Sequence, residues 1–161
     1  MDVQGQIEKA AALIANSGYA VALTGAGIST PSGIPDFRSP GSGLWEKVNP
    51  MLVASLLTFR LRPQAFYEWA RPLAEQLLRA EPNPAHRALA ELEEMGLLRA
   101  VITQNIDGLH QRAGSRRVLE LHGHLREATC LKCRRIVPTQ GMIERFLDTG
   151  EVPRCQCGGV L

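Results

Sequence analysis

Residues 19–27 read YAVALTGAG, an apolar run that leads directly into a turn containing Gly25 and Gly27. The run predicts a short buried strand, and the glycines predict the turn that ends it. Because glycine has no Cβ, the backbone of this turn can approach a pyrophosphate closely. A purely structural turn explains the two glycines equally well, since Thr30 stands where a dinucleotide-binding fingerprint has a third small residue.

Two further apolar runs also end at polar or glycine-containing turns. They are residues 98–103, followed by QNIDG at 104–108, and residues 118–121, followed by His122-Gly123. One helix is predicted before the first strand, from an amphipathic stripe over residues 5–16. Another is predicted between the first and second strands, with a start at Asn83-Pro84 and an end at Gly96. Strands that alternate with helices predict an α/β fold with a Rossmann-like parallel sheet.

The carboxyl ends of the predicted strands are where a ligand should bind. In open parallel sheets the binding crevice lies beyond these ends. The segments that follow the three strands are 24–38, 104–110 and 122–124. We therefore expect them to converge on one crevice.

A helical insertion is predicted between the first and second strands. Asn49-Pro50 and Arg62-Pro63 are both helix starts, and the second helix has an apolar face that includes Phe66 and Trp69. The expected organisation has three parts: an incomplete Rossmann-like domain formed by 1–44 and 81–124, a helical insertion over 45–80, and a small module over 125–161.

All four cysteines lie in the last of these parts. They form two pairs, Cys130 with Cys133 and Cys155 with Cys157, and 21 residues (134–154) lie between the pairs. This spacing suits one zinc ion held by four thiolates in a zinc-ribbon module, and four protein ligands make such an ion structural. Disulfide or redox use is the alternative, and the second pair has a shorter spacer than is usual. A short helix over about 139–147 separates the pairs.

Composition and charge exclude several classes of protein. The chain is 45% hydrophobic and 21% charged, which is typical of a globular domain and not of a disordered or fibrous one. A net charge of +2 gives no reason to expect a nucleic-acid partner. The sequence has no apolar run of about 18 residues and begins with a polar, acidic segment, so we expect no membrane association and a cytoplasmic location.

Three polar stretches could carry chemistry, and each has an ordinary structural interpretation. Asp36-Phe37-Arg38 combines a carboxylate, an aromatic ring and a guanidinium, but a solvated turn explains it as well. Gln104, Asn105 and Asp107 could bind a polar ligand or could cap the next helical turn. His122 follows the third strand, where an imidazole could act as a general base.

Taken together, the motifs resemble those of the sirtuins, which are NAD-dependent protein deacylases, and specifically those of the bacterial or archaeal type. The matching stretches are GAGIS at 25–29, GIPDFR at 33–38, TQNIDGLH at 103–110, LHG at 121–123 and the paired cysteines. Their order and spacing agree over the whole chain.

The resemblance implies a role for each candidate residue. His122 would be the general base, and the four cysteines would hold one structural Zn²⁺. The NAD-binding residues would be Gly25, Ala26, Gly27, Ser29, Ile34, Asp36, Phe37, Arg38, Gln104, Asn105, Ile106 and Asp107. The implied reaction removes acetyl groups from lysines of a protein or peptide substrate and yields nicotinamide and O-acetyl-ADP-ribose.

Sirtuins continue beyond the second cysteine pair, with further strands of the sheet and with residues that bind the substrate peptide and the adenosine. This sequence ends at Leu161. We therefore expect the 161 residues to be a fragment, truncated at the C-terminus, of a longer active sirtuin, and to be inactive by themselves. The alternatives are a non-catalytic, zinc-containing fragment and an NAD-dependent ADP-ribosyltransferase.

Overall fold

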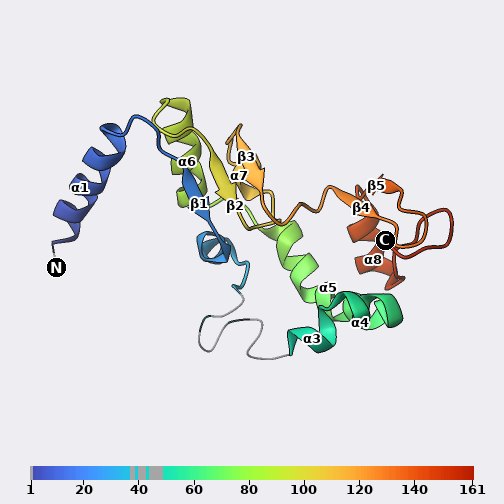
Figure 1. Cartoon of the computed structure of the whole chain (residues 1–161). Helices are drawn as coiled ribbons and strands as arrows, with labels where there is room; N and C mark the ends of the chain where they lie inside the picture. The colour runs from blue at the N-terminus through green and yellow to red at the C-terminus, as the bar shows by residue number, and fades with distance from the viewer. Residues whose placement is uncertain (1, 37–38, 40–42, 44–48) are drawn as a thin grey trace. The chain divides into compact units, whose positions relative to one another are not determined.

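The computed structural model describes residues 2–36, 39, 43 and 49–161 (Figure 1). It contains two compact units. Met1–Ile28 and Glu81–Gly123 form one, here called the sheet unit, and Ser29–Ala80 and His124–Leu161 form the other, here called the cysteine unit. Each unit is described separately below.

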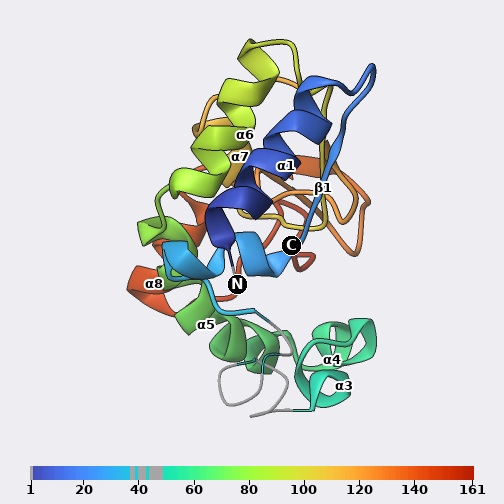
Figure 2. The same cartoon turned by 90° about the vertical axis from the view of Figure 1, so that its left-hand side faces the viewer.

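The sheet unit is built on three short parallel strands in the order β1-β2-β3, which confirms the predicted parallel sheet. The strands are β1 Ala22–Thr24, β2 Val101–Thr103 and β3 Val118–Glu120. The helices are α1 Val3–Ala15, α6 Pro84–Glu94 and α7 Leu109–Arg112, with a 3₁₀ turn over Ala26–Ile28. Helices α6 and α7 pack together (Figure 2), and the fully buried Val101 and Leu109 lie at the core of this unit.

Strand β2 is shorter than the apolar run that predicts it, and hydrogen bonding explains the difference. The amides of Leu97 and Leu98 donate to the carbonyl of Leu92 and so close the end of α6. Gly96 takes the left-handed conformation, with φ +75°, in that turn. The beginning of the apolar run therefore terminates a helix before the strand begins.

Helix α6 begins where the sequence predicts, at a capping box. The Asn83 side chain accepts a hydrogen bond from the Ala85 amide at 2.9 Å, and His86 Nδ1 accepts one from the Asn83 amide at 3.4 Å. The Asn83 side chain also donates to the Ile28 carbonyl at 2.7 Å. The cap therefore both starts α6 and ties it to the end of the glycine turn.

The cysteine unit combines helices with a β-hairpin. The helices are α3 Pro50–Val53, α4 Leu56–Leu61, α5 Pro63–Arg79 and α8 Met142–Thr149, with a 3₁₀ turn over Thr30–Ser32. Strands β4 Glu127–Thr129 and β5 Ile136–Pro138 pair antiparallel. None of the helices among the described residues has both the length and the apolar character to cross a membrane.

Two helices of this unit differ from the expectation. The start at Asn49-Pro50 gives only the four-residue α3, because Ser55 is extended, with φ −83° and ψ 151°, and caps a separate helix by accepting from the Thr58 amide. Helix α8 begins later than predicted, after Gly141 in the left-handed conformation. The Thr139 amide instead pairs with the Arg126 carbonyl and extends the hairpin.

Arg71 of α5 holds the end of α8. Its guanidinium donates to the carbonyl oxygens of Leu147 at 2.6 Å and Phe146 at 3.1 Å, and lies 4.6 Å from the centre of the Phe146 ring. The Phe146 ring also contacts that of Tyr67, with ring centres 5.1 Å apart. The cation thus satisfies carbonyls in the last turns of a helix while covering an aromatic face.

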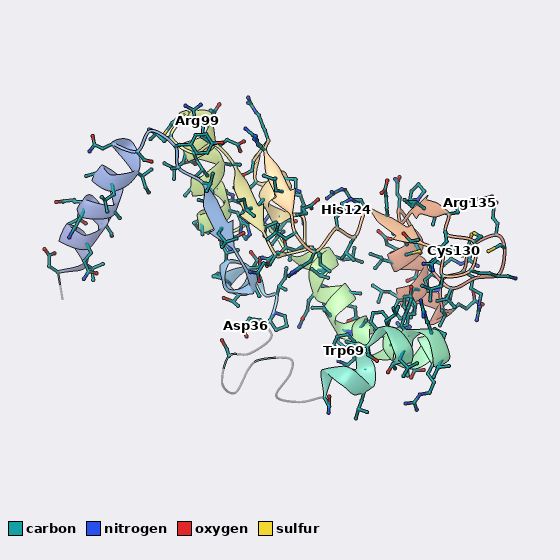
Figure 3. The ribbon with its side chains drawn as sticks, in the orientation of Figure 1. Asp36, Trp69, Arg99, His124, Cys130 and Arg135 are labelled. Atoms are coloured by element: carbon teal, nitrogen blue, oxygen red, sulfur yellow. The ribbon has the colours of Figure 1, made fainter. Side chains whose placement is uncertain are left out.

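Replacing Arg71 with Met should destabilise the cysteine unit by about 1–3 kcal/mol, because the Leu147 carbonyl loses the donor that Arg71 provides and the Phe146 carbonyl keeps only the Gly150 amide. Urea unfolding followed by tryptophan fluorescence measures this change, since Trp69 lies on the same helix (Figure 3). Arg79→Met, at an exposed position of α5, is the matched control. Equal unfolding midpoints for the two variants would contradict the assignment.

Candidate functional site

The ends of β1 and β2 are joined by their last side chains. Thr24 pairs in register with Thr103, and the Thr24 hydroxyl donates to Thr103 Oγ1 at 2.8 Å. The Gln104 amide then donates to the Thr24 carbonyl at 3.0 Å. As a result, the glycine turn that follows β1 and the polar segment that follows β2 start from the same place.

The glycine turn lies against that polar segment. A Cβ at Gly25 would stand 3.8 Å from Gln104 Oε1, and the Asn105 side-chain amide donates to the Gly25 carbonyl at 3.2 Å. At Gly27, by contrast, no atom of the described residues lies within 4 Å of the position that a Cβ would take. This side of the turn has room for a bound group.

Of the polar residues at 104–107, one caps the next helix and another contacts the glycine turn. Asp107 Oδ1 accepts from the Leu109 amide at 2.9 Å, so Asp107 does cap the start of α7. Asn105 reaches across to the glycine turn, while its own amide donates to Thr103 Oγ1 at 3.1 Å. Ile106 is 37% exposed between them.

His122 is brought to the same segment from the end of β3. Its Nδ1 lies 3.0 Å from the Gln104 carbonyl oxygen, and the imidazole is exposed. A carbonyl oxygen can only accept, so Nδ1 carries the hydrogen and donates it. The neutral ring therefore presents a free lone pair at Nε2, the atom that could take a proton from a substrate.

The predicted NAD-binding residues divide between the units. The sheet unit brings together Gly25, Ala26, Gly27, Gln104, Asn105, Ile106 and Asp107, with His122. Ser29, Ile34 and Asp36 belong to the cysteine unit.

Within the cysteine unit, Ser29 is 1% and Ile34 8% exposed. Asp36 (Figure 3) accepts hydrogen bonds from the amide and the hydroxyl of Ser39. Phe37 and Arg38 lie outside the described residues.

Thr24, Thr103 and His110 are site residues that the sequence reasoning missed. His110 Nε2 lies 2.9 Å from Thr24 Oγ1, and His110 is only 1% exposed. A threonine at the end of each of two neighbouring strands is the signal that could have pointed to this contact. Burial lowers the pKa of His110, with a further decrease from His86 and an opposing increase from Asp107.

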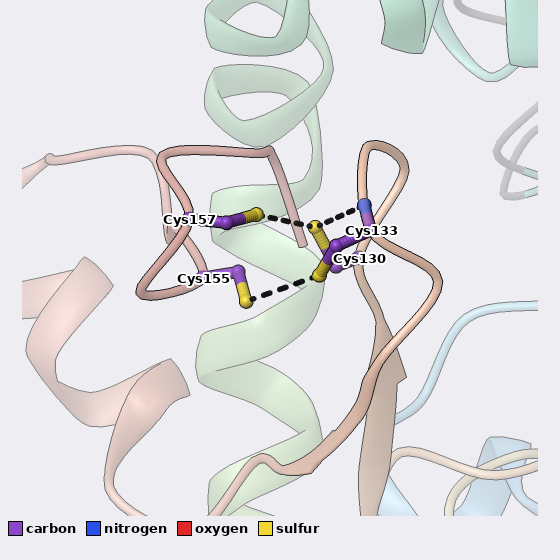
Figure 4. A group of neighbouring side chains, drawn as sticks. All are labelled: Cys130, Cys133, Cys155 and Cys157. Carbon is purple, nitrogen blue, oxygen red and sulfur yellow. Dashed lines mark hydrogen bonds between the residues drawn. The ribbon is translucent and has the colours of Figure 1, made fainter.

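The four cysteine sulfurs form one cluster (Figure 4). All four Sγ atoms lie within 4.8 Å of one another, with Cys130 and Cys157 3.5 Å apart and Cys133 and Cys155 3.8 Å apart. Zn–S bonds of about 2.3 Å in a tetrahedron place sulfurs roughly 3.8 Å apart. The cluster could therefore hold one zinc ion with no open coordination position, despite the short spacer of the second pair.

Neighbouring groups shift the pKa values of two of the thiols in opposite directions. The Cys133 amide donates to Cys130 Sγ, which lowers the pKa of the Cys130 thiol to about 6. The pKa of Cys133 rises to about 11: a bond from the Arg135 backbone lowers it, but hydrogen bonds with neighbouring sulfurs and burial outweigh that effect. Gly159 crosses close to the cluster, and a Cβ there would stand only 2.5 Å from Cys130 Sγ.

The fold and the two sites define a class: an α/β protein with a glycine turn and a histidine at the carboxyl ends of parallel strands, and with a zinc-type cysteine cluster. The Sir2 family model matches residues 25–161. The chain belongs to the Sir2 family, as the sequence motifs predict.

Relatives and solved structures agree with this assignment. The chain is 51% identical over 156 residues to the NAD-dependent protein deacetylase of Sulfurisphaera tokodaii and 53% identical over 157 residues to the NAD-dependent protein deacylase 2 of Archaeoglobus fulgidus. Each alignment covers 97% of this chain, and 62% and 61% of the respective relative.

A solved Sir2 enzyme structure that is 52% identical superposes with a TM-score of 0.88 over 97% of this chain and 61% of that one. Another, of a Sir2 protein with p53 peptide and NAD⁺, gives a TM-score of 0.79 at 43% identity, over 96% of this chain and 61% of that one. The chain thus spans about three fifths of the length of the curated relatives that it matches.

Gly159→Ala should weaken zinc binding by about tenfold or more, because the new methyl group displaces the Cys130 sulfur. Competition with a chromophoric zinc chelator measures the affinity. Gly18→Ala is the control, since no described atom lies within 4 Å of a Cβ at that position. Unchanged zinc affinity in Gly159→Ala would show that the cluster does not need this close approach.

The sheet unit should lose stability as the pH falls below about 6.5. Burial lowers the folded-state pKa of both His86 and His110 from an ordinary value of 6.5, so the unfolded chain takes up protons there first. Urea unfolding followed by far-UV circular dichroism at about pH 7.5 and 5.5 tests this dependence. In His110→Gln the loss of stability between the two pH values should shrink, and an unchanged loss would contradict the prediction.

Proposed function

We propose that the protein is an NAD-dependent protein-lysine deacetylase that yields deacetylated lysine, nicotinamide and O-acetyl-ADP-ribose. The main observation that supports this proposal is the hydrogen bond from His122 Nδ1 to the Gln104 carbonyl. This bond leaves the Nε2 lone pair free at the carboxyl ends of the strands, where a ligand would bind. The relatives named as NAD-dependent deacetylases support the same reaction.

In this proposal His122 is the general base. Bound NAD would supply the ribose carbon to which the acetyl oxygen bonds as nicotinamide leaves. His122 Nε2 would then take the proton of a ribose hydroxyl as that oxygen bonds to the acyl carbon. The bond from the acyl carbon to the lysine nitrogen would break, one water would be taken up, and the free lysine amine would leave. The Gln104 carbonyl keeps the ring in the required tautomer and stabilises the positive charge that the ring acquires.

The proposed NAD contacts follow from the chemistry of each segment. The open backbone at Ala26 and Gly27 would face the phosphates and ribose, because no side chain shields it at Gly27. Asn105, Ile106 and Asp107 would receive the nicotinamide carboxamide. We propose the remaining predicted residues as further contacts of the same cofactor: Gly25, Ser29, Ile34, Asp36, Phe37, Arg38 and Gln104.

The two remaining parts of the proposal concern organisation and location. We propose that 1–44 and 81–124 bind NAD, that 45–80 are a helical insertion, and that 125–161 hold the structural zinc. An acetyl-lysine protein or peptide would be the substrate. We also propose that the protein works in the cytoplasm, because a reducing compartment keeps four clustered thiols available for a metal.

A chimaera tests the reaction directly. Residues 1–161 replace the matching part of the Sulfurisphaera tokodaii relative, and the product is assayed for NAD-dependent nicotinamide release with an acetyl-lysine peptide. We expect turnover, and we expect His122→Ala to reduce it by about 10²–10⁴-fold, the usual contribution of a general base.

Two controls make the result specific. His122→Gln keeps a polar side chain but lacks a titratable nitrogen, so it should be as inactive as His122→Ala. Mass spectrometry of the products separates the reactions: O-acetyl-ADP-ribose supports deacetylation, and ADP-ribose attached to protein supports the transferase instead. Full activity of either variant would exclude His122 as the base.

A further inference from the structure

Two histidines of the sheet unit that the proposed reaction does not use are fully buried side by side. His86 of α6 is 0% and His110 of α7 is 1% exposed, and their ring centres lie 4.8 Å apart with an interplanar angle of 62°. Each ring has one nitrogen without a hydrogen-bond partner among the described residues, namely His86 Nε2 and His110 Nδ1. Buried polar atoms of this kind normally have a partner, so these two require an explanation.

The directions of the hydrogen bonds fix the tautomer of His110. The single hydrogen of the Thr24 hydroxyl is donated to Thr103 Oγ1. Thr24 Oγ1 can therefore only accept from His110, so the hydrogen of the neutral ring is on Nε2. His110 Nδ1 is consequently an acceptor.

The helix cap fixes the tautomer of His86 in the same way. The Asn83 amide donates to His86 Nδ1, which must therefore be unprotonated. The hydrogen of the neutral His86 ring is on Nε2, and this nitrogen is a donor. The two unpartnered nitrogens are thus a donor on His86 and an acceptor on His110, and no hydrogen bond joins them.

Both rings are held in the neutral form. Burial is the main cause of the lowered pKa of each, and the proximity of His86 lowers that of His110 further. Asp107 acts in the opposite sense on both rings. Neutrality matters because a protonated His110 would carry a second N–H, on Nδ1, that has no acceptor among the described residues.

We infer that His110, through its bond to Thr24, is a positioning residue for residues 104–107. The connection runs from His110 Nε2 to Thr24 Oγ1, then to Thr103 Oγ1, which also accepts from the Asn105 amide. The functional meaning rests on the proposed function, in which this segment receives nicotinamide. The positioning itself does not depend on that activity.

Amide hydrogen exchange of the full 161-residue chain tests the positioning. In His110→Leu, protection of the Asn105 amide should fall by roughly tenfold, the scale of one lost hydrogen bond, because Thr24 loses its donor. His110→Gln should retain protection, since its side-chain amide can still donate to Thr24. The Val101 amide, which pairs β2 with β3, is the internal control and should change less than about twofold in either variant.

His86 provides the comparison within the same buried pair. His86→Gln keeps an acceptor for the Asn83 amide at the third position of the capping box and leaves His110 in place. We therefore expect His86→Gln to preserve both Asn105 protection and the Nε2–H tautomer of His110. Long-range ¹H–¹⁵N correlation spectra of the imidazole nitrogens report the tautomer.

The opposite results overturn the inference. If His86→Gln lowers Asn105 protection as much as His110→Leu does, the effect comes from repacking of the buried pair and not from the bond of His110 to Thr24. If His110→Leu lowers the protection of Asn105 and Val101 equally, the effect is global destabilisation. Neither measurement requires NAD or substrate, so a failure of the proposed deacetylase activity would be seen separately, in the chimaera assay.

Discussion

The register of β1 against β2 is the constraint on which the site depends. Parallel pairing sets Thr24 opposite Thr103 at the last position of each strand, and one hydroxyl donates to the other. The two segments that leave these residues must therefore begin next to each other, whatever their own conformational preferences. The bond from the Asn105 side chain to the Gly25 carbonyl is a direct consequence.

Two histidines of the sheet unit differ in which ring nitrogen carries the hydrogen, because their hydrogen-bond partners differ. His122 is exposed and donates from Nδ1 to a carbonyl, so the free lone pair is on Nε2. His110 is buried and donates from Nε2 to a hydroxyl. One ring can exchange a proton, while the other keeps its proton and fixes the strand ends.

The cysteine unit depends on a different kind of constraint. Its hairpin and α8 offer few buried apolar side chains among the described residues, chiefly Phe146 and two of the cysteines. The bonds of Arg71 to the end of α8 add cohesion, and metal coordination by the four cysteines would add more than so small a core can supply. The absence of a side chain at Gly159 allows the two cysteine loops to meet.

The sequence by itself determined the fold class, the family and the zinc-type cluster, because turn residues, helix caps such as Asn83 and cysteine spacing act locally. Only the tertiary structure decided the length of β2, the separate helix α4 and the contact between His110 and Thr24. The first two depend on which local hydrogen bonds form, from Leu97 and Leu98 to Leu92 and from Thr58 to Ser55. The third joins residues 86 positions apart, and periodicity carries no information about such partners. The same holds for His122: its motif indicated a base, but only its bond to the Gln104 carbonyl selects the tautomer that can act as one.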